Sequence, residues 1–467
     1  MSHATPLLPA RQVATTCRQL QQGEGLPFAH HLPKPRIHDA LRRAGASFRD
    51  RLFSPAVTLW AFLSQVLDHD HSCRQVMARL FAWLAAQGRA PRSADTGAYC
   101  KARARFPEAA LRQLARDTGR GPLEEAPASW LWQGRVVKVV DGTGVSMPDT
   151  PENQRGYPQH PRQKPGCGFP LMRLVVVFAL AVGTALDAAM GRYQGKGTGE
   201  LALFRALDDA LGRGDVLLAD RGFCSYFVAA AALARGADVV LRLSASRKVN
   251  FQAGRRLGPG DKLVWWKRTA RPGWMSKEEY AALPRDLKLR AVRVRVRRRG
   301  CRTKVVLVVT TLLDPAAARK DDLAELYRAR WHAELDLRSI KQALQMDVLR
   351  GKTPDMVRKE VWAHLLAYNV VRGLMARAAR AAGVRPRELS FTGALQTLNA
   401  FLPYLGRAAS EAEWSRLWGE MVRALGQHRV GDRPGRYEPR AVKRRPKNYT
   451  RLNEPRAKAR KRLAAGT

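Results

Sequence analysis

Two aspartates follow apolar, β-branched runs, a position from which a carboxylate can take part in catalysis. Asp141 comes directly after the run at 135–140, and Asp220 comes directly after the run at 215–219. Carboxylates at the ends of neighbouring strands can converge, and two or three of them can hold Mg²⁺ or Mn²⁺ for phosphodiester chemistry. The simpler interpretation is that each aspartate only forms a turn at the end of its strand. The two residues alone do not decide between these interpretations.

A third carboxylate, Glu334, lies in a segment without Gly or Pro that predicts a helix from residue 321 to about 346. At about 100° per residue, Arg330, Glu334 and Lys341 share a stripe roughly 60° wide with Tyr327. One carboxylate between two cations and a phenol fits a metal ligand with phosphate clamps. The alternative is an exposed helix with i,i+4 ion pairs. A neighbouring face can pack on a sheet and consists of Leu326, Ala333, Leu337, Ile340 and Leu344.

The elements around these carboxylates predict an α/β core. Strands alternate with helices, which favours packed layers of both. The predicted strands lie at 135–140, 171–182, 185–194, 215–219 and 238–243, and the predicted helices lie at 198–211 and 225–235.

Residues 244–320 interrupt this alternation with a strongly basic segment. It holds 21 Lys and Arg against 5 Asp and Glu. Arg293, Arg295 and Arg297 alternate with valines, so one face of a strand is a row of arginines. A turn at 299–301 leads to a second strand at 303–312. We predict an inserted β-rich subdomain with a cationic face.

The chain before and after this core predicts helices. Those at 55–87 and 93–105 form either a helix-turn-helix-like DNA-binding unit or a packing subdomain with a basic face. Residues 122–127 predict a linker. Further helices are predicted at 356–382, 391–401 and 414–425. The tail at 427–467 carries 14 Lys and Arg against 3 Asp and Glu, a composition typical of a disordered segment.

The charge of the whole chain points to a polyanionic partner. Among 467 residues, 82 Lys and Arg oppose 40 Asp and Glu, a formal net charge of +42. Nucleic acid is the favoured partner, ahead of a membrane surface, and a general basic bias is the alternative. No apolar run of ~18 residues predicts a membrane span. No secretion signal is recognised, and the six cysteines lack zinc or disulfide spacing, so reduced cytoplasmic thiols are expected.

The spacing Tyr327-x2-Arg330-x3-Glu334-x6-Lys341 is similar to the Y-R-E-K signature of the insertion sequence family-four transposases. These are DDE transposases with a ribonuclease H-like core. The sequences that begin at Asp141 (Asp-Gly-Thr) and Asp220 (Asp-Arg-Gly-Phe) resemble the two aspartate motifs of that family. The insertion before the Glu334 helix matches as well. The resemblance covers roughly residues 50–455.

The resemblance implies specific roles for six residues. Asp141, Asp220 and Glu334 are expected to be catalytic and to bind Mg²⁺ or Mn²⁺ as a pair of ions. The residues expected to contact DNA are Tyr327, Arg330 and Lys341. A tryptophan of the insertion is expected to stack on a flipped base, or else belongs to the subdomain core; the candidates are Trp265, Trp266 and Trp274.

The resemblance also implies the organisation and the partners. The expected fold is α/β, a ribonuclease H-like mixed sheet flanked by helices, with an inserted β-rich subdomain and helical N- and C-terminal regions. The expected divisions are a helical region at 1–125, core at 130–243, insertion at 244–320, core again at 321–382, and a helical region with a basic tail at 383–467. The expected partner is double-stranded DNA, at the element ends and at the target. The protein is expected to act as a homodimer in a synaptic complex and to be associated with the nucleoid in the bacterial cytoplasm.

Two alternatives to a cut-and-paste transposase stay open. The first is a metal-dependent nuclease on the same core that cuts without strand transfer. The second is a DNA-binding descendant that has no catalytic activity.

Overall fold

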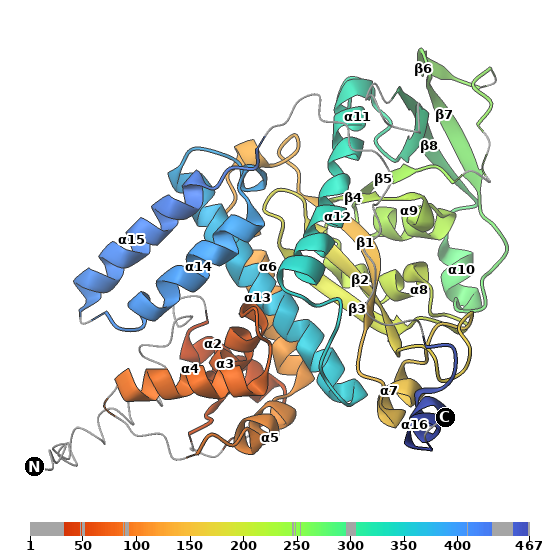
Figure 1. Cartoon of the computed structure of the whole chain (residues 1–467). Helices are drawn as coiled ribbons and strands as arrows, with labels where there is room; N and C mark the ends of the chain where they lie inside the picture. Colours follow the sequence, from red (N-terminus) through yellow and green to blue (C-terminus); the bar gives the residue numbers. More distant parts are fainter. Residues whose placement is uncertain are drawn as a thin grey trace, which may run out of the picture. The chain divides into compact units, whose positions relative to one another are not determined.

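The computed structural model describes residues 32–46, 48, 52–86, 88, 93–244, 247, 249–252, 254–295, 305–408, 410–431 and 452–465. They fall into two compact units (Figure 1). The helical unit lies within Met1–Ala126, Val182–Leu186 and Leu337–Val430, and the sheet unit lies within Pro127–Ala181, Asp187–Asp336 and Gly431–Thr467.

The sheet unit is built on a nine-stranded sheet. Its first five strands are β1 (Val137–Ser146), β2 (Leu171–Ala179), β3 (Ala185–Arg192), β4 (Val216–Ala219) and β5 (Asp238–Arg242). They lie in the order β3-β2-β1-β4-β5. β1 pairs antiparallel with β2 and parallel with β4, and β4 pairs parallel with β5. This arrangement, with helices on both faces, is ribonuclease H-like, so the predicted fold class is confirmed (Figure 1).

The central strands consist of residues that favour a sheet buried on both faces. All four side chains of β4, Val-Leu-Leu-Ala, are buried, and so is the run 174–179 of β2. Continuous apolar strands of this kind are typical of sheets covered by helices. Helix α8 (Glu200–Arg205) precedes β4, and α9 (Tyr226–Ala234) crosses from β4 to β5. The sheet is therefore a rigid base for residues at strand ends.

The insertion extends this same sheet. Its elements are β6 (Arg256–Gly258), β7 (Asp261–Lys267), α10 (Lys277–Ala282), β8 (Asp286–Arg295) and β9 (Val305–Thr310). β9 pairs antiparallel with β5, and the order continues β5-β9-β8-β7-β6. Arg293 and Arg295 are exposed beside buried valines, as the predicted alternation requires. Arg297 and the predicted turn at 299–301 lie outside the described residues.

A buried arginine ties the insertion together. Arg290 in β8 is fully buried and donates to both carboxylate oxygens of Asp261, with Nε–Oδ1 and Nη2–Oδ2 distances of 2.8 and 2.5 Å. Its Nη1 donates to the carbonyl oxygen of Ala318 at 2.5 Å. A bidentate carboxylate partner is what allows a guanidinium to be buried. These bonds join two strands of the insertion to the segment that leads into the Glu334 helix.

The helical unit contains helices from both ends of the chain. They are α2 (Lys34–Arg43), α3 (Pro55–Leu67), α4 (Cys73–Ala86), α5 (Gly97–Arg105), α6 (Glu108–Glu124), α13 (Pro354–Ala381), α14 (Phe391–Leu405) and α15 (Glu411–Gln427). Helices α2 and α6 were not predicted, and the helix predicted at 55–87 is divided into α3 and α4. Buried Asn369 of α13 donates from Nδ2 to the carbonyl oxygens of Ala115 and Ala185, at 2.8 Å each. The predicted linker at 122–127 is wrong in part, because α6 continues through Pro122.

Two further findings concern the tail and membranes. Part of the tail, predicted to be disordered, forms helix α16 (Arg456–Ala464), while 432–451 lies outside the described residues. None of the helices in the described ranges combines the length and the apolar composition that crossing a membrane requires.

Candidate active site

The pairing of β1 with β4 brings Asp141 and Asp220 side by side. Their last parallel pair is Val140 with Ala219, and the next residue on each strand is an aspartate. Neighbouring strands lie about 5 Å apart, so the two carboxylates start from adjacent backbone positions. Asp220 follows β4 as predicted. The prediction that Asp141 ends its strand is wrong, because β1 stays paired with β2 as far as Ser146.

Each aspartate is fixed by a hydrogen bond to the backbone that follows it. Asp141 Oδ1 accepts from the Gly142 amide at 2.9 Å, and Asp220 Oδ1 accepts from the Gly222 amide at 2.7 Å. These short-range bonds are typical of aspartates at turns and strand ends. They hold the carboxylates near the backbone and leave the remaining oxygens available for other partners.

Another carboxylate, Glu200 of α8, lies against the backbone of the residue after Asp141, on the face of β1 opposite to the Asp141 side chain. A Cβ on Gly142 would lie 2.5 Å from Glu200 Cδ and 2.6 Å from its Oε1. Glycine at 142 therefore leaves the space that the Glu200 side chain of α8 occupies. Glu200 lies in the helix predicted at 198–211, but nothing in its local sequence sets it apart from an ordinary acidic residue in the first turn of a helix.

Glu334 is held by an arginine one helical turn before it. Helix α11 (Lys320–Ala329) carries Tyr327, Arg330 follows α11, and α12 (Trp331–Arg338) carries Glu334. Arg330 Nη2 donates to Glu334 Oε1 at 2.6 Å. The predicted apolar face of this segment is buried as expected, at Leu326, Ala333, Leu337, Ile340 and Leu344.

The predicted single helix is interrupted, and this changes the predicted stripe. α11 gives way to α12 at Arg330, and a π-helical turn, Ser339–Ala343, follows α12. A π-turn changes the angle per residue, so the 100° rule does not carry from Glu334 to Lys341. Lys341 lies in that turn, in the helical unit, and its DNA contact stays a prediction.

Electrostatics connect the three carboxylates. The pKa of Asp141 is raised to about 6, chiefly because the carboxyl is buried and in smaller part by the charges of Glu334 and Asp220, while the Gly142 amide and Arg330 act to lower it. Burial also raises the pKa of the Tyr327 phenol. In the sheet unit, Asp141 is thus affected by the charges of Asp220, Glu334 and Arg330, and Tyr327 by the charges of Arg330 and Asp220.

Comparison with known proteins identifies the family. Residues 132–370, which include the three carboxylates, match the family described as "Transposase DDE domain". The chain belongs to the DDE transposases. Residues 25–116 match a second family, "Insertion element 4 transposase N-terminal". DDE transposases cut DNA and join it to new DNA, so this transposase is an enzyme that acts on DNA.

Individual relatives agree with this family. The transposase is 27% identical over 407 residues to "Transposase InsG for insertion sequence element IS4" of Escherichia coli (strain K12), covering 86% of this chain and 88% of that one. It is 36% identical over 62 residues to "Transposase for insertion sequence element IS421" of Escherichia coli, a match that covers 13% of this chain and 16% of that one. The resemblance seen in the Y-R-E-K spacing is therefore confirmed, and the chain is an insertion-sequence transposase.

A solved structure was also found similar. It is the piggyBac transposase synaptic complex with hairpin DNA, with a TM-score of 0.42 and 10% identity over 91% of this chain and 87% of that chain.

DDE transposases use divalent metal ions, and the predicted carboxylates fit such ions chemically. Asp141, Asp220 and Glu334 offer only oxygen donors, the ligands that Mg²⁺ prefers. The raised pKa of Asp141 shows a buried carboxylate that other carboxylates repel, a state that a divalent cation would relieve. Within the described ranges, no three carboxylate, imidazole or thiol side chains are grouped closely enough to enclose an ion as they stand. Glu334 pairs with Arg330 instead.

The three candidate tryptophans differ in exposure. Trp266 is 6% exposed and lies under the Arg247 guanidinium at 4.3 Å, a core position. Trp265 is 55% exposed and Trp274 is 48% exposed. A base can stack only on an accessible indole face, and the Arg205 guanidinium lies 4.0 Å from the centre of the Trp274 ring. Trp265 is therefore the better placed candidate for DNA contact, and the contact stays a prediction.

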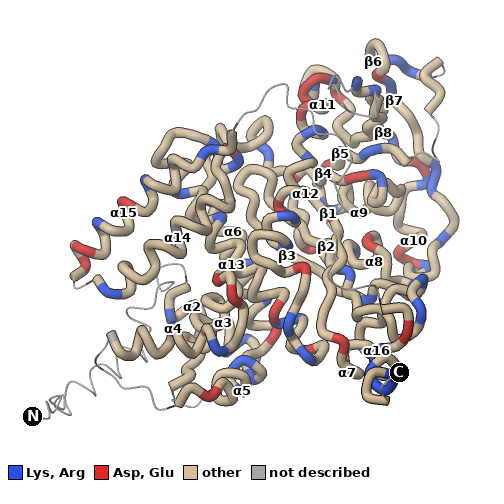
Figure 2. Tube along the Cα trace, viewed as in Figure 1, with Lys and Arg blue, Asp and Glu red and all other residues tan. Residues whose placement is uncertain are grey.

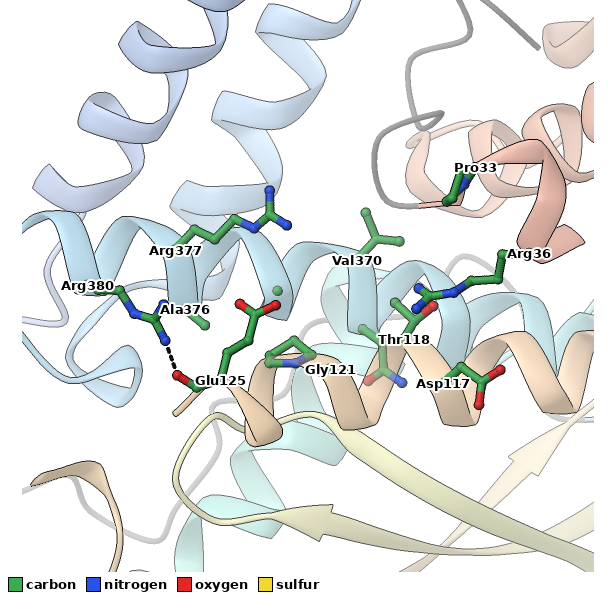
Figure 3. A pocket seen from close by; sticks show the side chains of 13 residues that line it. Pro33, Arg36, Asp117, Thr118, Gly121, Glu125, Val370, Ala376, Arg377 and Arg380 are labelled. Carbon is green, nitrogen blue, oxygen red and sulfur yellow. Dashed lines mark hydrogen bonds between the residues drawn. The ribbon is translucent and has the colours of Figure 1, made fainter. Parts of the chain in front are cut away.

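A cavity of about 290 Å³ lies in the helical unit between α2, α6 and α13 (Figure 3). Thr118 comes from α6 and Glu125 directly follows that helix, and Arg380 of α13 donates to the Glu125 carbonyl oxygen. None of the described residues that line this cavity is a predicted site residue.

Proposed function

We propose that this transposase cuts and joins DNA with Asp141, Asp220 and Glu334 as its catalytic carboxylates. One observation carries the proposal: the two aspartates occupy adjacent positions on paired strands, and Glu334 raises the pKa of one of them. The charges of Asp220 and Glu334 both raise the pKa of Asp141, so the three carboxylates interact electrostatically. In a chain of this family, this interaction supports a shared role at one phosphodiester.

The three carboxylates would hold two Mg²⁺ or Mn²⁺ ions. When bound, such ions activate water and stabilise the leaving oxygen in phosphodiester cleavage. The role of the protein is to keep the carboxylates ionised and in place. The sheet fixes the two aspartates, and α12 supplies Glu334.

Arg330 has two roles in this proposal. Without DNA it neutralises Glu334, at 2.6 Å. When a DNA phosphate arrives, the planar guanidinium can bind it through two donors, which frees Glu334 to bind metal. Tyr327 and Lys341 add contacts to the DNA. Burial keeps the Tyr327 phenol protonated, so it acts as a hydrogen-bond donor and not as a nucleophile.

The reaction consists of hydrolysis and transesterification. Water attacks the phosphodiester at the end of the element and frees a 3′-OH. That 3′-OH then attacks a phosphodiester of target DNA, forms one P–O bond and breaks another. The partners are the terminal inverted repeats and target DNA. A homodimer that holds two ends in a synaptic complex, in the nucleoid of a bacterial cytoplasm, completes the proposal.

The test uses the DNA that flanks the reading frame as labelled duplexes, with purified full-length protein and Mg²⁺ or Mn²⁺. Glu334→Gln is compared with Glu325→Gln, because Glu325 is an exposed glutamate of the preceding helix α11. We expect wild type and Glu325→Gln to cut the end and join it to target. We expect Glu334→Gln to lose at least about 100-fold in cutting, since metal assistance contributes several kcal/mol.

Two other outcomes would change the proposal. Metal-dependent cutting without end preference and without joined product would favour the nuclease alternative. Specific binding of the ends without cutting, in wild type as in the variants, would favour the descendant without catalysis.

A further inference from the structure

Helix α16 is strongly basic and has little apolar surface to bury. Five of its nine residues are Lys or Arg, all exposed (Figure 2): Arg456, Lys458, Arg460, Lys461 and Arg462. Ala459 is its buried residue, and Leu463 is 73% exposed. Like charges three and four residues apart destabilise a helix, and a helix this short is marginal by itself. Contacts outside the helix must therefore stabilise it.

Those contacts come from the loop at 157–170 of the same unit. A Cβ on Gly166 would lie 3.1 Å from Pro455, and the Arg456 guanidinium lies 5.6 Å from the centre of the Phe169 ring. Arg462 Nε donates to Glu454 at 3.0 Å. The helix is therefore seated on the unit that carries Asp141.

Three cations of α16 have no carboxylate partner in the part of the chain that the structure describes. Among the described residues, no carboxylate lies within ion-pair distance of Lys458, Arg460 or Lys461. The loop adds the exposed cations Arg162 and Lys164. We call these five side chains the C-terminal basic face. Its charge is complementary to a phosphate backbone, and contacts from lysine and arginine to phosphates position DNA without reading its sequence.

The register of the sheet gives the distance from the candidate active site to Phe169, the loop residue that α16 contacts next to this face. Asp141 pairs with Val176 of β2, and Phe169 lies seven residues before Val176. At ~3.4 Å per residue the separation along the strand is at most roughly 24 Å, and from Asp141 to the end of β1 it is already about 17 Å. At 3.4 Å per base pair this is about five to seven base pairs of duplex.

We propose that the C-terminal basic face binds the backbone of the duplex that is being cut, five to seven base pairs from the cleaved bond. This inference rests on the proposed role of Asp141. It assigns α16 a positioning role: the helix holds the duplex so that the scissile phosphate meets the carboxylates.

The test removes three charges of the face by Lys458→Gln, Arg460→Gln and Lys461→Gln together. The control removes three exposed charges of the helical unit, by Arg407→Gln, Arg416→Gln and Arg423→Gln. Binding of an end duplex by full-length protein is measured without metal, from 50 to 200 mM salt. Each lost phosphate contact makes the plot of log affinity against log salt less steep by about 0.9. For three lost contacts, the wild-type affinity should fall about 40 times more than the affinity of the face variant between 50 and 200 mM salt.

Ethylation interference gives the position. In wild type, ethylation of the phosphates about five to seven base pairs from the element terminus should weaken binding. We expect this interference to disappear in the face variant and to remain in the control. An unchanged slope and pattern would overturn the proposal. Equal slope changes in both variants without a local change would overturn it too, because charge in general would then be the cause. The salt dependence of binding and the interference pattern are both measured without cleavage. The proposal on the basic face can therefore fail while the Glu334 cutting test succeeds, and it can hold while that test fails.

Discussion

Acid should destabilise the helical unit through His364, a buried histidine of α13. Its Nδ1 lies 2.7 Å from the Glu360 carbonyl oxygen, and burial, with a smaller effect of His71, lowers its pKa to about 3. In the unfolded chain the pKa is about 6.5, so between these values the unfolded state binds a proton that the folded state does not. Stability is complete above pH 6.5 and falls as the pH falls. From pH 7.5 to 5.0 the loss from His364 is about 2 kcal/mol.

The measurement is the free energy of unfolding by urea at several pH values between 7.5 and 5.0. His364→Leu should remove about 2 kcal/mol of the loss, while His69→Gln, at an exposed histidine, should leave it unchanged. Glu360 acts in the opposite direction, because burial raises its pKa and the folded state then binds more protons. The difference between variants therefore isolates His364. Parallel curves for wild type and His364→Leu would refute this reasoning.

Four other predictions concern two glycines, Tyr327 and a pair of cysteines. Gly119→Ala should lower the free energy of unfolding by roughly 1–3 kcal/mol, because its Cβ would lie 2.2 Å from a backbone oxygen. Gly121→Ala on the same helix meets no atom within 4 Å and should be stabilising by up to about 1 kcal/mol; equal melting temperatures would contradict both. Tyr327→Phe should keep cutting within about tenfold of wild type, since one hydrogen bond is lost, whereas a phosphotyrosine adduct in wild type would contradict the mechanism. The Cys73 and Cys100 sulfurs lie 3.8 Å apart, so diamide should link them, faster at high pH because burial raises the Cys73 pKa. Peptide mapping that finds both thiols free after treatment at pH 9 would contradict this.

The sequence predicted an element correctly where the preference of its local residues agrees with the pairing and packing found in the folded chain. The apolar run of β4 ends in Asp220, and both the run and its end were predicted correctly. For β1 the prediction stopped at Asp141, because Gly142, Thr143 and Gly144 include poor strand formers. They are extended because β2 pairs with them, a long-range contact that no local pattern shows.

The Glu334 helix illustrates the same limit. Its buried face followed from periodicity, since apolar side chains pack at three- and four-residue steps whether or not the helix is regular. Its two irregularities, at Arg330 and at 339–343, depend on packing and leave no mark in the composition. The insertion was predicted as β-rich, but its pairing with β5 depends on residues about seventy positions apart and could not be predicted.

The continuous sheet has a consequence for solubility. Without the insertion, β5 would be a free edge strand, and its Val240 and Leu241 backbone groups, now paired with Thr310 and Val309, would be open to other chains. Unprotected apolar edges promote aggregation. β8, in contrast, carries exposed Arg293 and Arg295, and charged side chains protect an edge. Shortened relatives should therefore keep β9 as the cover of β5.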